Sequence, residues 1–228
     1  MGIFDKFKKD KNVKMHYPQY LYNDLEIEEL DSFISDVIGN YKDVFHEIAS
    51  PDIHLDVCVV EPSEEEPYYK LVTMGAGAYN MAIPEQWKHY NIENAEYIIY
   101  LPKDWDFKSD KDINYWPIKL LKDVARLPIW YDTWLSYGHT TQYDEEGSSY
   151  ASNTRFNSVV LNYASNSKGD IRLIMSNNRV INFYEIILLY PEELAFKLET
   201  DADTLFNKFL EKGIDYKVID INRKSIIE

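Results

Sequence analysis

Residues 114–140 read NYWPIKLLKDVARLPIWYDTWLSYGHT, and this stretch holds three of the five Trp residues. Four apolar side chains recur in it at helical spacing: Leu120, Leu121, Val124 and Ala125. Pro117 suits the first position of a helix, because a proline there lacks only an N–H that would be unpaired anyway, and Pro128 is a helix-ending signal. The pattern predicts a helix over residues 117–127. Its charged side chains are predicted to lie in water: Lys119, Lys122 and Arg126.

Large aromatic side chains follow Pro128, in residues 130–137. They are too large and apolar for a solvated loop, so this segment is predicted to be extended and packed against the rest of the protein. Trp and Tyr are also the side chains that most often anchor protein interfaces. A short strand ending at Gly138-His139-Thr140 can present its edge to an added strand of another protein.

On both sides of this stretch, short strand-like runs alternate with amphipathic helices. β-Branched and aromatic runs predict strands at residues 44–48, 55–60, 68–74, 97–101, 153–163, 171–175, 180–190 and 214–221. Further helices are predicted at residues 23–38, 191–197 and 203–212. The first of these has Asn23 as its N-cap with Glu26 three residues on, and Gly39 at its end.

The strand at residues 55–60 has apolar side chains on both faces, so it is predicted to be covered on both faces. We therefore expect an α+β fold, a single domain with a mixed, mostly antiparallel β-sheet packed by helices. The central helix is predicted to lie on a sheet face that carries Val57, Val59, Ile98 and Ile187.

Composition bounds the class of protein. Of the 228 residues, 45% are apolar and 15% aromatic, which is typical of a globular protein. The single cysteine, Cys58, excludes an intramolecular disulfide and a cysteine cage for zinc. No apolar run is long enough to span a membrane and no signal peptide is evident, so we expect a cytoplasmic location.

The first residues differ in composition from the remainder, with five Lys against two Asp in residues 1–14. We divide the chain into a basic N-terminal tail, residues 1–15, and a domain, residues 16–228. The tail has two open interpretations. It can dock its aromatic side chains on the domain, which we favour, or touch an anionic membrane without stable association.

The formal net charge of −15 disfavours nucleic acid as a partner, because nucleic-acid affinity comes largely from cationic contacts to phosphate. It favours encounter with a basic protein, although solubility alone also explains it. Three consecutive carboxylates in a predicted turn, Glu64, Glu65 and Glu66, are candidate contacts for such a partner.

Motifs for cofactors, metals and catalysis are incomplete. Gly75-Ala76-Gly77 begins like a dinucleotide fingerprint but has Asn80 at the third glycine position, so a tight turn is expected instead. His46-Glu47 lacks the second His of a zinc hydrolase. Asp132 and His139 can form a general base and its orienting partner, but a structural role for each is the expected alternative. We predict no cofactor, no metal and no enzymatic activity.

Several short strings in the chain resemble the suppressor of fused (SUFU) domain in its bacterial single-domain form. The resemblance covers roughly residue 43 to the end of the chain. Its landmarks are Tyr115-Trp116-Pro117, Leu120-Leu121, Ala125-Arg126-Leu127-Pro128, Asp132-Thr133-Trp134, Tyr137-Gly138-His139-Thr140, Pro67-Tyr68-Tyr69, Leu71-Val72-Thr73-Met74-Gly75, Tyr100-Leu101-Pro102 with Trp105, and Ile181-Asn182-Phe183-Tyr184.

The resemblance implies a non-catalytic protein-binding domain that sequesters or inhibits a partner. SUFU domains in animals hold a short peptide of Gli transcription factors as an added strand, and bacterial members recur as candidate immunity proteins in polymorphic toxin systems. A basic toxin domain is the partner this implies. The alternatives are a metal-independent hydrolase using Asp132 and His139, and a housekeeping scaffold without a toxin partner. Besides residues 64–66, the predicted partner-binding residues are Trp130, Asp132, Trp134, Tyr137, Gly138, His139 and Thr140.

Overall fold

The computed structural model describes residues 18–47, 50, 52–106, 109 and 111–227. Within them, eight strands form one sheet in the order β1-β2-β3-β4-β10-β6-β5, with β9 also paired to β10. Only the β4–β10 pair is parallel among these, so the sheet is mixed and mostly antiparallel, as predicted. The strands are β1 Tyr41–Phe45, β2 Asp56–Val60, β3 Tyr68–Met74, β4 Asn94–Pro102, β5 Thr140–Gln142, β6 Ser158–Tyr163, β9 Arg172–Ile174 and β10 Val180–Leu189. A separate ribbon pairs β7 Ser165–Asn166 with β8 Gly169–Asp170.

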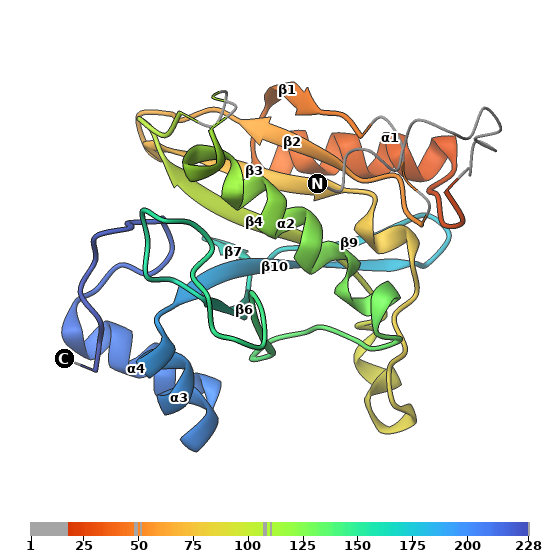
Figure 1. The fold of residues 1–228 in the computed structure, drawn as a ribbon. Coiled ribbons are helices and arrows are strands. Elements are labelled where there is room, and N and C mark those ends of the chain that lie inside the picture. The colour runs from red at the N-terminus through yellow and green to blue at the C-terminus, as the bar shows by residue number, and fades with distance from the viewer. Residues whose placement is uncertain (1–17, 48–49, 51, 107–108, 110, 228) are drawn as a thin grey trace, which may run out of the picture.

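Helices cover both faces and one end of the sheet (Figure 1). The α-helices are α1 Asp24–Phe33, α2 Asp112–Trp130, α3 Pro191–Glu199 and α4 Ala202–Lys212. Shorter turns are the π-turn η2 Ile34–Ile38 and the 3-10 helices η3 Ala76–Ala78 and η4 Glu85–Tyr90. No helix among the described residues is long and apolar enough to cross a lipid bilayer.

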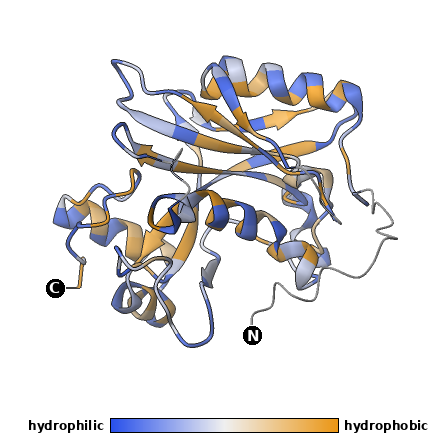
Figure 2. Cartoon of the chain, turned by 45° about the horizontal axis from the view of Figure 1, so that its top comes forward, coloured by the Kyte–Doolittle hydropathy of each residue, from blue (hydrophilic) through white to orange (hydrophobic). Residues whose placement is uncertain are grey.

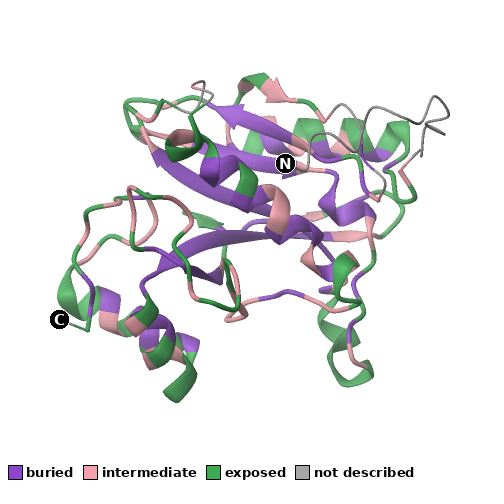
Figure 3. Cartoon of the chain, viewed as in Figure 1, coloured by how far each residue is buried: buried purple, intermediate pink, exposed green. Residues whose placement is uncertain are grey.

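Each face of the sheet has its own apolar cluster. The face under α2 contains Val57 and Val59 of β2, and the face under α1 contains Cys58 and Ile98. The two-sided burial predicted for β2 is therefore confirmed. Figure 2 shows apolar residues concentrated on the central strands, with apolar and polar residues alternating along the helices, and Figure 3 shows that the central strands are buried almost throughout.

Two residues predicted to lie under the central helix lie elsewhere. Ile98 belongs to the cluster under α1, because it alternates with neighbours that face α2. Ile187 belongs to a third cluster, in which α3 and α4 cover the ends of β6 and β10. The prediction of this packing face was correct for Val57 and Val59 only.

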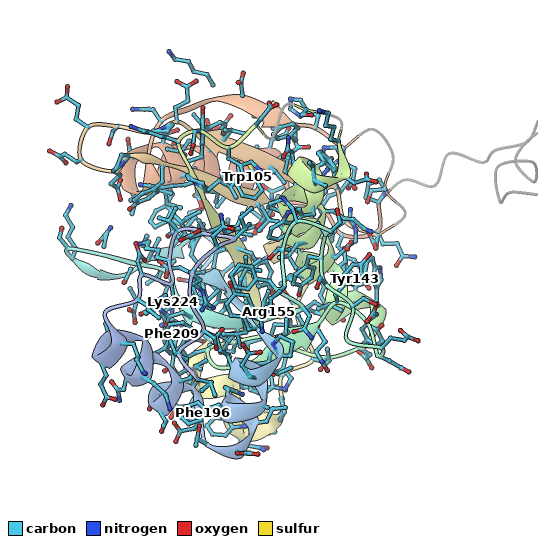
Figure 4. The ribbon with its side chains drawn as sticks, turned by 60° about the vertical axis from the view of Figure 1, so that its left-hand side comes forward. Trp105, Tyr143, Arg155, Phe196, Phe209 and Lys224 are labelled. Atoms are coloured by element: carbon cyan, nitrogen blue, oxygen red, sulfur yellow. The ribbon has the colours of Figure 1, made fainter. Side chains whose placement is uncertain are left out.

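The chain after α4 runs back over the sheet without forming the strand predicted at residues 214–221. A single bridge joins Val218 to Tyr100. Arg223 fastens the segment, since its guanidinium donates two hydrogen bonds of 2.6 Å to the fully buried carboxylate of Glu193 on α3. The same guanidinium lies 4.6 Å from the ring centre of Tyr190 and 5.0 Å from that of Phe209. Figure 4 shows Phe209 on α4 close to Lys224 of this segment.

α2 is longer than predicted at both ends, and Pro117 and Pro128 lie inside it. A proline inside a helix removes one backbone donor. At Pro117 the missing N–H is the one that would bond to the Ile113 carbonyl. The side-chain amide of Asn153 supplies a replacement donor to that carbonyl at 3.1 Å. Packing of the buried face of α2 against the sheet stabilises the helix by more than the two prolines destabilise it. The predicted helix boundaries, residues 117 and 127, were therefore wrong.

Arg126 is also not in water. Its guanidinium donates to Glu47 Oε2 at 2.5 Å, to Asp52 Oδ1 at 3.2 Å and to Ser50 Oγ at 3.1 Å, and only 8% of the residue is exposed. The extended segment predicted from Trp130 begins later, because Trp130 ends α2 and Tyr131 caps it.

The predicted features of the N-terminal helix are confirmed at its start. The Asn23 side chain accepts the Glu26 N–H at 3.0 Å, and the Glu26 carboxylate accepts the Asn23 N–H at 2.9 Å. The helix ends in the π-turn, where the Gly39 N–H donates to the Ile34 carbonyl at 2.9 Å. The extra residue of this turn rotates Val37 outward, where it is 37% exposed.

Gly75-Ala76-Gly77 forms the predicted tight turn and is already filled by a side chain of the protein. The N–H groups of Gly75 and Gly77 each donate to Glu96 Oε1 at 3.0 Å, and the Tyr22 hydroxyl donates to the same oxygen at 2.9 Å. Gly75 has φ +133°, and a Cβ there would collide with the His54 carbonyl. Burial raises the pKa of Glu96, whereas these donors lower it. The turn therefore cradles a carboxylate in place of a phosphate.

Candidate protein-binding site

β5 is an edge strand, because it pairs with β6 on one side and with no described strand on the other. The His139 carbonyl and the Tyr143 N–H, which flank β5, bond to the β6 side at 2.9 and 2.8 Å. Bonding alternates along an antiparallel strand, so Thr141 faces β6 as well. The N–H and C=O groups of Thr140 and Gln142 therefore point outward along a free edge. The Gln142 carbonyl oxygen also accepts the Thr141 hydroxyl at 3.3 Å, which leaves it one lone pair for a further donor.

This free edge borders a groove of about 780 Å³. The opposite wall is one face of α2, built from residues three or four apart: Leu120, Asp123, Val124 and Leu127. Tyr143 and Tyr150, from the chain after β5, also line the groove, and Figure 4 shows Tyr143 beside α2. The groove combines outward-facing backbone groups, an apolar wall and aromatic side chains, which is the combination that an extended peptide requires.

The charge of the groove is mainly negative. Asp123, Asp144 and Glu145 line it, and among the lining residues that the structure describes the single cation is Lys197, contributed by α3. Burial lowers the pKa of Lys197. A basic segment is thus the better match for most of the groove.

Four of the predicted partner-binding residues line the groove. They are Trp130, Trp134, His139 and Thr140. Trp130 is 52% exposed and is free to anchor a ligand. The Trp134 ring is half-buried and meets the His139 imidazole edge-on, with ring centres 4.3 Å apart.

Three neighbours of these residues lie outside the groove lining, and two of them, Tyr137 and Gly138, have structural contacts. Tyr137 stacks on Tyr163, with ring centres 4.9 Å apart, and its hydroxyl donates to Asp203. Gly138 has φ +76° and donates its N–H to the β6 backbone at 2.8 Å. Asp132 turns the chain with a left-handed φ of 47° and points to solvent.

The carboxylates at residues 64–66 are not part of the groove lining. Glu64 and Glu65 are exposed, in the loop between β2 and β3. Glu66 is held by the protein itself, because Lys70 Nζ lies 2.5 Å from its Oε2 and the Tyr68 hydroxyl donates to its Oε1 at 3.0 Å. Only Glu64 and Glu65 therefore offer unengaged charge to a partner.

His139 and Asp132 do not form a catalytic pair. His139 Nδ1 lies 3.2 Å from the Trp134 carbonyl oxygen, and no hydrogen bond joins it to Asp132 in the part of the chain that the structure describes. Asp132 is also absent from the groove lining, so the two side chains do not meet in this groove. Across the described residues, no group of three or more His, Cys, Asp or Glu side chains is arranged to hold a metal ion.

Burial lowers the pKa of His139 below its ordinary value, and nearby Lys197 lowers it further, against the Trp134 carbonyl, which raises it. The unfolded chain therefore takes up a proton first as pH falls, and the folded state loses stability in that range. We expect wild-type stability to fall more steeply than that of His139→Gln between about pH 6.5 and about pH 5. Denaturant melts of both proteins across this range measure the difference, and parallel curves would contradict it.

Asp123 and Tyr150 are among the lining residues that were missed in the sequence. Asp123 lies on α2 three residues after Leu120, and Tyr150 lies in the loop before β6. The signal for Asp123 was its position beside the apolar stripe of the helix. Nothing in the sequence separates Tyr150 from the other 18 Tyr residues.

Comparison with known proteins places this fold. The model of the family described as Suppressor of fused protein (SUFU) matches residues 51–224, which is more than half of the chain. The chain belongs to the suppressor of fused family. All the groove-lining residues of this SUFU protein lie within the region that the family model matches. Several of them, such as Trp134 and His139, belong to the sequence strings that resemble the family.

The relatives are distant in sequence but similar in fold. Protein UU111 of Ureaplasma parvum serovar 3 is 24% identical over 214 residues, covering 88% of this chain and 96% of its own. The crystal structure of a SUFU homolog from Neisseria gonorrhoeae FA 1090 has 20% identity and a TM-score of 0.63, covering 89% of this chain and 97% of its own. The Sufu–Fu complex structure has 12% identity and a TM-score of 0.61, covering 88% and 90%.

These findings confirm the predicted family and the predicted fold class, an α+β domain with a mostly antiparallel sheet. Membership of this family of non-catalytic regulatory proteins indicates a protein-interaction domain.

Proposed function

We propose that this SUFU domain sequesters a partner protein by binding an extended segment of it as an added strand on β5. The observation that carries the proposal is the free edge of β5 facing the groove of about 780 Å³. Outward N–H and C=O groups at Thr140 and Gln142 supply sequence-independent hydrogen bonds, and the groove supplies contacts for side chains. The family and a relative solved as the Sufu–Fu complex support a protein ligand.

We further propose that the partner is basic, and that the domain acts as an immunity protein against a toxin domain. The net charge of −15 and the acidic groove support this choice, because complementary charge speeds the encounter of two proteins. A housekeeping scaffold would use the same groove. The identity of the bound partner, and whether the domain neutralises its toxicity in cells, distinguish the two functions.

A library of random peptides displayed on phage tests the groove directly, because the selection does not require the natural partner. Selection against the wild-type domain is expected to enrich peptides of β-forming composition. In NMR titrations these should shift the amide signals of β5 and of the α2 face around Val124. Enrichment of peptides that shift only signals outside these two elements would refute strand addition.

Association with a basic partner is expected to slow as salt rises, because the Debye length shortens to about 8 Å at physiological ionic strength. Reversing Glu64 and Glu65 to Lys should slow association further without unfolding the protein, since both are exposed. The matched control reverses Glu28 and Asp36, which are exposed on the α1 side. If the association rate measured by stopped flow changes with neither salt nor charge reversal, the acidic surface serves solubility alone.

A further inference from the structure

Asp123 is a half-buried carboxylate without a bonding partner. It lies on α2 between the apolar side chains that form the groove wall. It makes no hydrogen bond and no ion pair with any residue that the structure describes, although Lys119 and Arg126 are near enough to influence its charge. Arg126 is occupied by Glu47 and Asp52. Burial raises the pKa of Asp123, because it removes water from around the charged carboxylate.

Tyr150 brings a second unpaired group to the same place. Its hydroxyl is buried and has no hydrogen-bond partner among the described residues. The ring is held between Trp116, stacked at 5.7 Å, and Tyr143, edge-on at 5.4 Å. Asp123 and Tyr150 line the same groove, and the charge of Asp123 adds to the burial that raises the pKa of Tyr150. Buried hydroxyls without a partner are uncommon, and each calls for an explanation.

A cationic side chain in the groove would meet the Asp123 carboxylate, with the Tyr150 hydroxyl oxygen as the second acceptor that the fold leaves unpaired. Its methylene stem would pack on Leu120 and Val124. The exposed face of Tyr143 favours a cation as well, since Lys119 Nζ already lies 5.7 Å from its ring centre.

We propose that Asp123 and Tyr150 form a subsite of the groove that binds a Lys or Arg side chain of the captured segment. The subsite rests on the proposed function, since it specifies the chemistry of the segment that β5 binds. Hydrogen bonding to the backbone on β5 alone would accept many peptide sequences. The subsite restricts them to segments with a Lys or Arg at the matching position.

The subsite is tested apart from strand addition with a small probe, the n-butylguanidinium ion. NMR titration is expected to give saturable shifts at Leu120, Asp123 and Tyr150, and the neutral analogue n-butylurea should give none. Asp123→Asn should weaken binding of the ion about tenfold, the value of one charge-assisted hydrogen bond. Asp36→Asn, an equal change of charge at an exposed position on the α1 side, should leave binding unchanged.

Stability distinguishes a binding role from a structural one. A carboxyl whose pKa is raised by folding destabilises the folded state when it is ionised, so Asp123→Asn should melt at a higher temperature than wild type at pH 7. A lower melting temperature would make Asp123 a structural stabiliser and overturn the proposal. Equal shifts with n-butylguanidinium and n-butylurea, or no saturable shift at Asp123, would overturn it too. Neither result affects strand addition, which the selected peptides test independently.

Discussion

Gln142→Pro is expected to weaken binding of the captured segment about 100-fold while changing the free energy of unfolding by no more than about 1 kcal/mol. The outward N–H of Gln142 is one of the donors on the free edge of β5, and proline removes it. The proline ring also occupies the space in which the added strand must lie. An edge position whose N–H faces away from the sheet tolerates proline, so the fold should survive.

The neighbouring residue provides the control. Thr141 faces β6, so Thr141→Pro breaks the ladder between β5 and β6 and should destabilise the protein by about 3 kcal/mol. Calorimetric titration with a selected peptide and denaturant melts separate the two effects. Peptide affinity unchanged in Gln142→Pro would place the binding surface elsewhere.

Glu193→Ala is expected to lower the free energy of unfolding by about 3–5 kcal/mol, because it leaves the buried guanidinium of Arg223 without its counter-charge. Glu193 is fully buried and also accepts the N–H groups of Tyr190 and Ile226, at 2.9 and 3.1 Å. Its loss therefore detaches the C-terminal segment from α3 as well.

Glu192, one residue earlier, is the matched control for this change. It pairs with Arg155 at 3.1 Å, but the Arg155 side chain is 63% exposed, and such surface pairs contribute about 0–1 kcal/mol. Urea melts of Glu192→Ala and Glu193→Ala compare the two directly. Equal losses in the two variants would show that burial of the Arg223 pair contributes no additional stability.

The elements predicted correctly depend on neighbours in the sequence. The start of α1 follows from Asn23 and Glu26, and β3 begins and ends where its β-branched and aromatic run does. α2 was predicted too short because the proline signals are local. The donor that replaces the missing one at Pro117 comes from Asn153, 40 residues away from the carbonyl that it reaches.

Part of the lining of the candidate groove could be predicted for the same reason. Trp130, Trp134, His139 and Thr140 follow one another closely, and their aromatic and edge-strand character is visible in the sequence. From the sequence alone, Asp123 resembles a solvent-facing charge on a helix. The structure shows that it shares a groove with β5 and Tyr150. Arg126 had the same appearance, yet its partners Glu47 and Asp52 lie 79 and 74 residues away.

Amide hydrogen exchange along β5, with and without a selected peptide, tests strand addition most directly. An added strand bonds only to the outward groups, so the Thr140 and Gln142 amides should become protected on binding. The Thr141 amide, already bonded to β6, should change little. Protection that leaves Thr140 and Gln142 unchanged, or that appears only outside β5, would contradict the account.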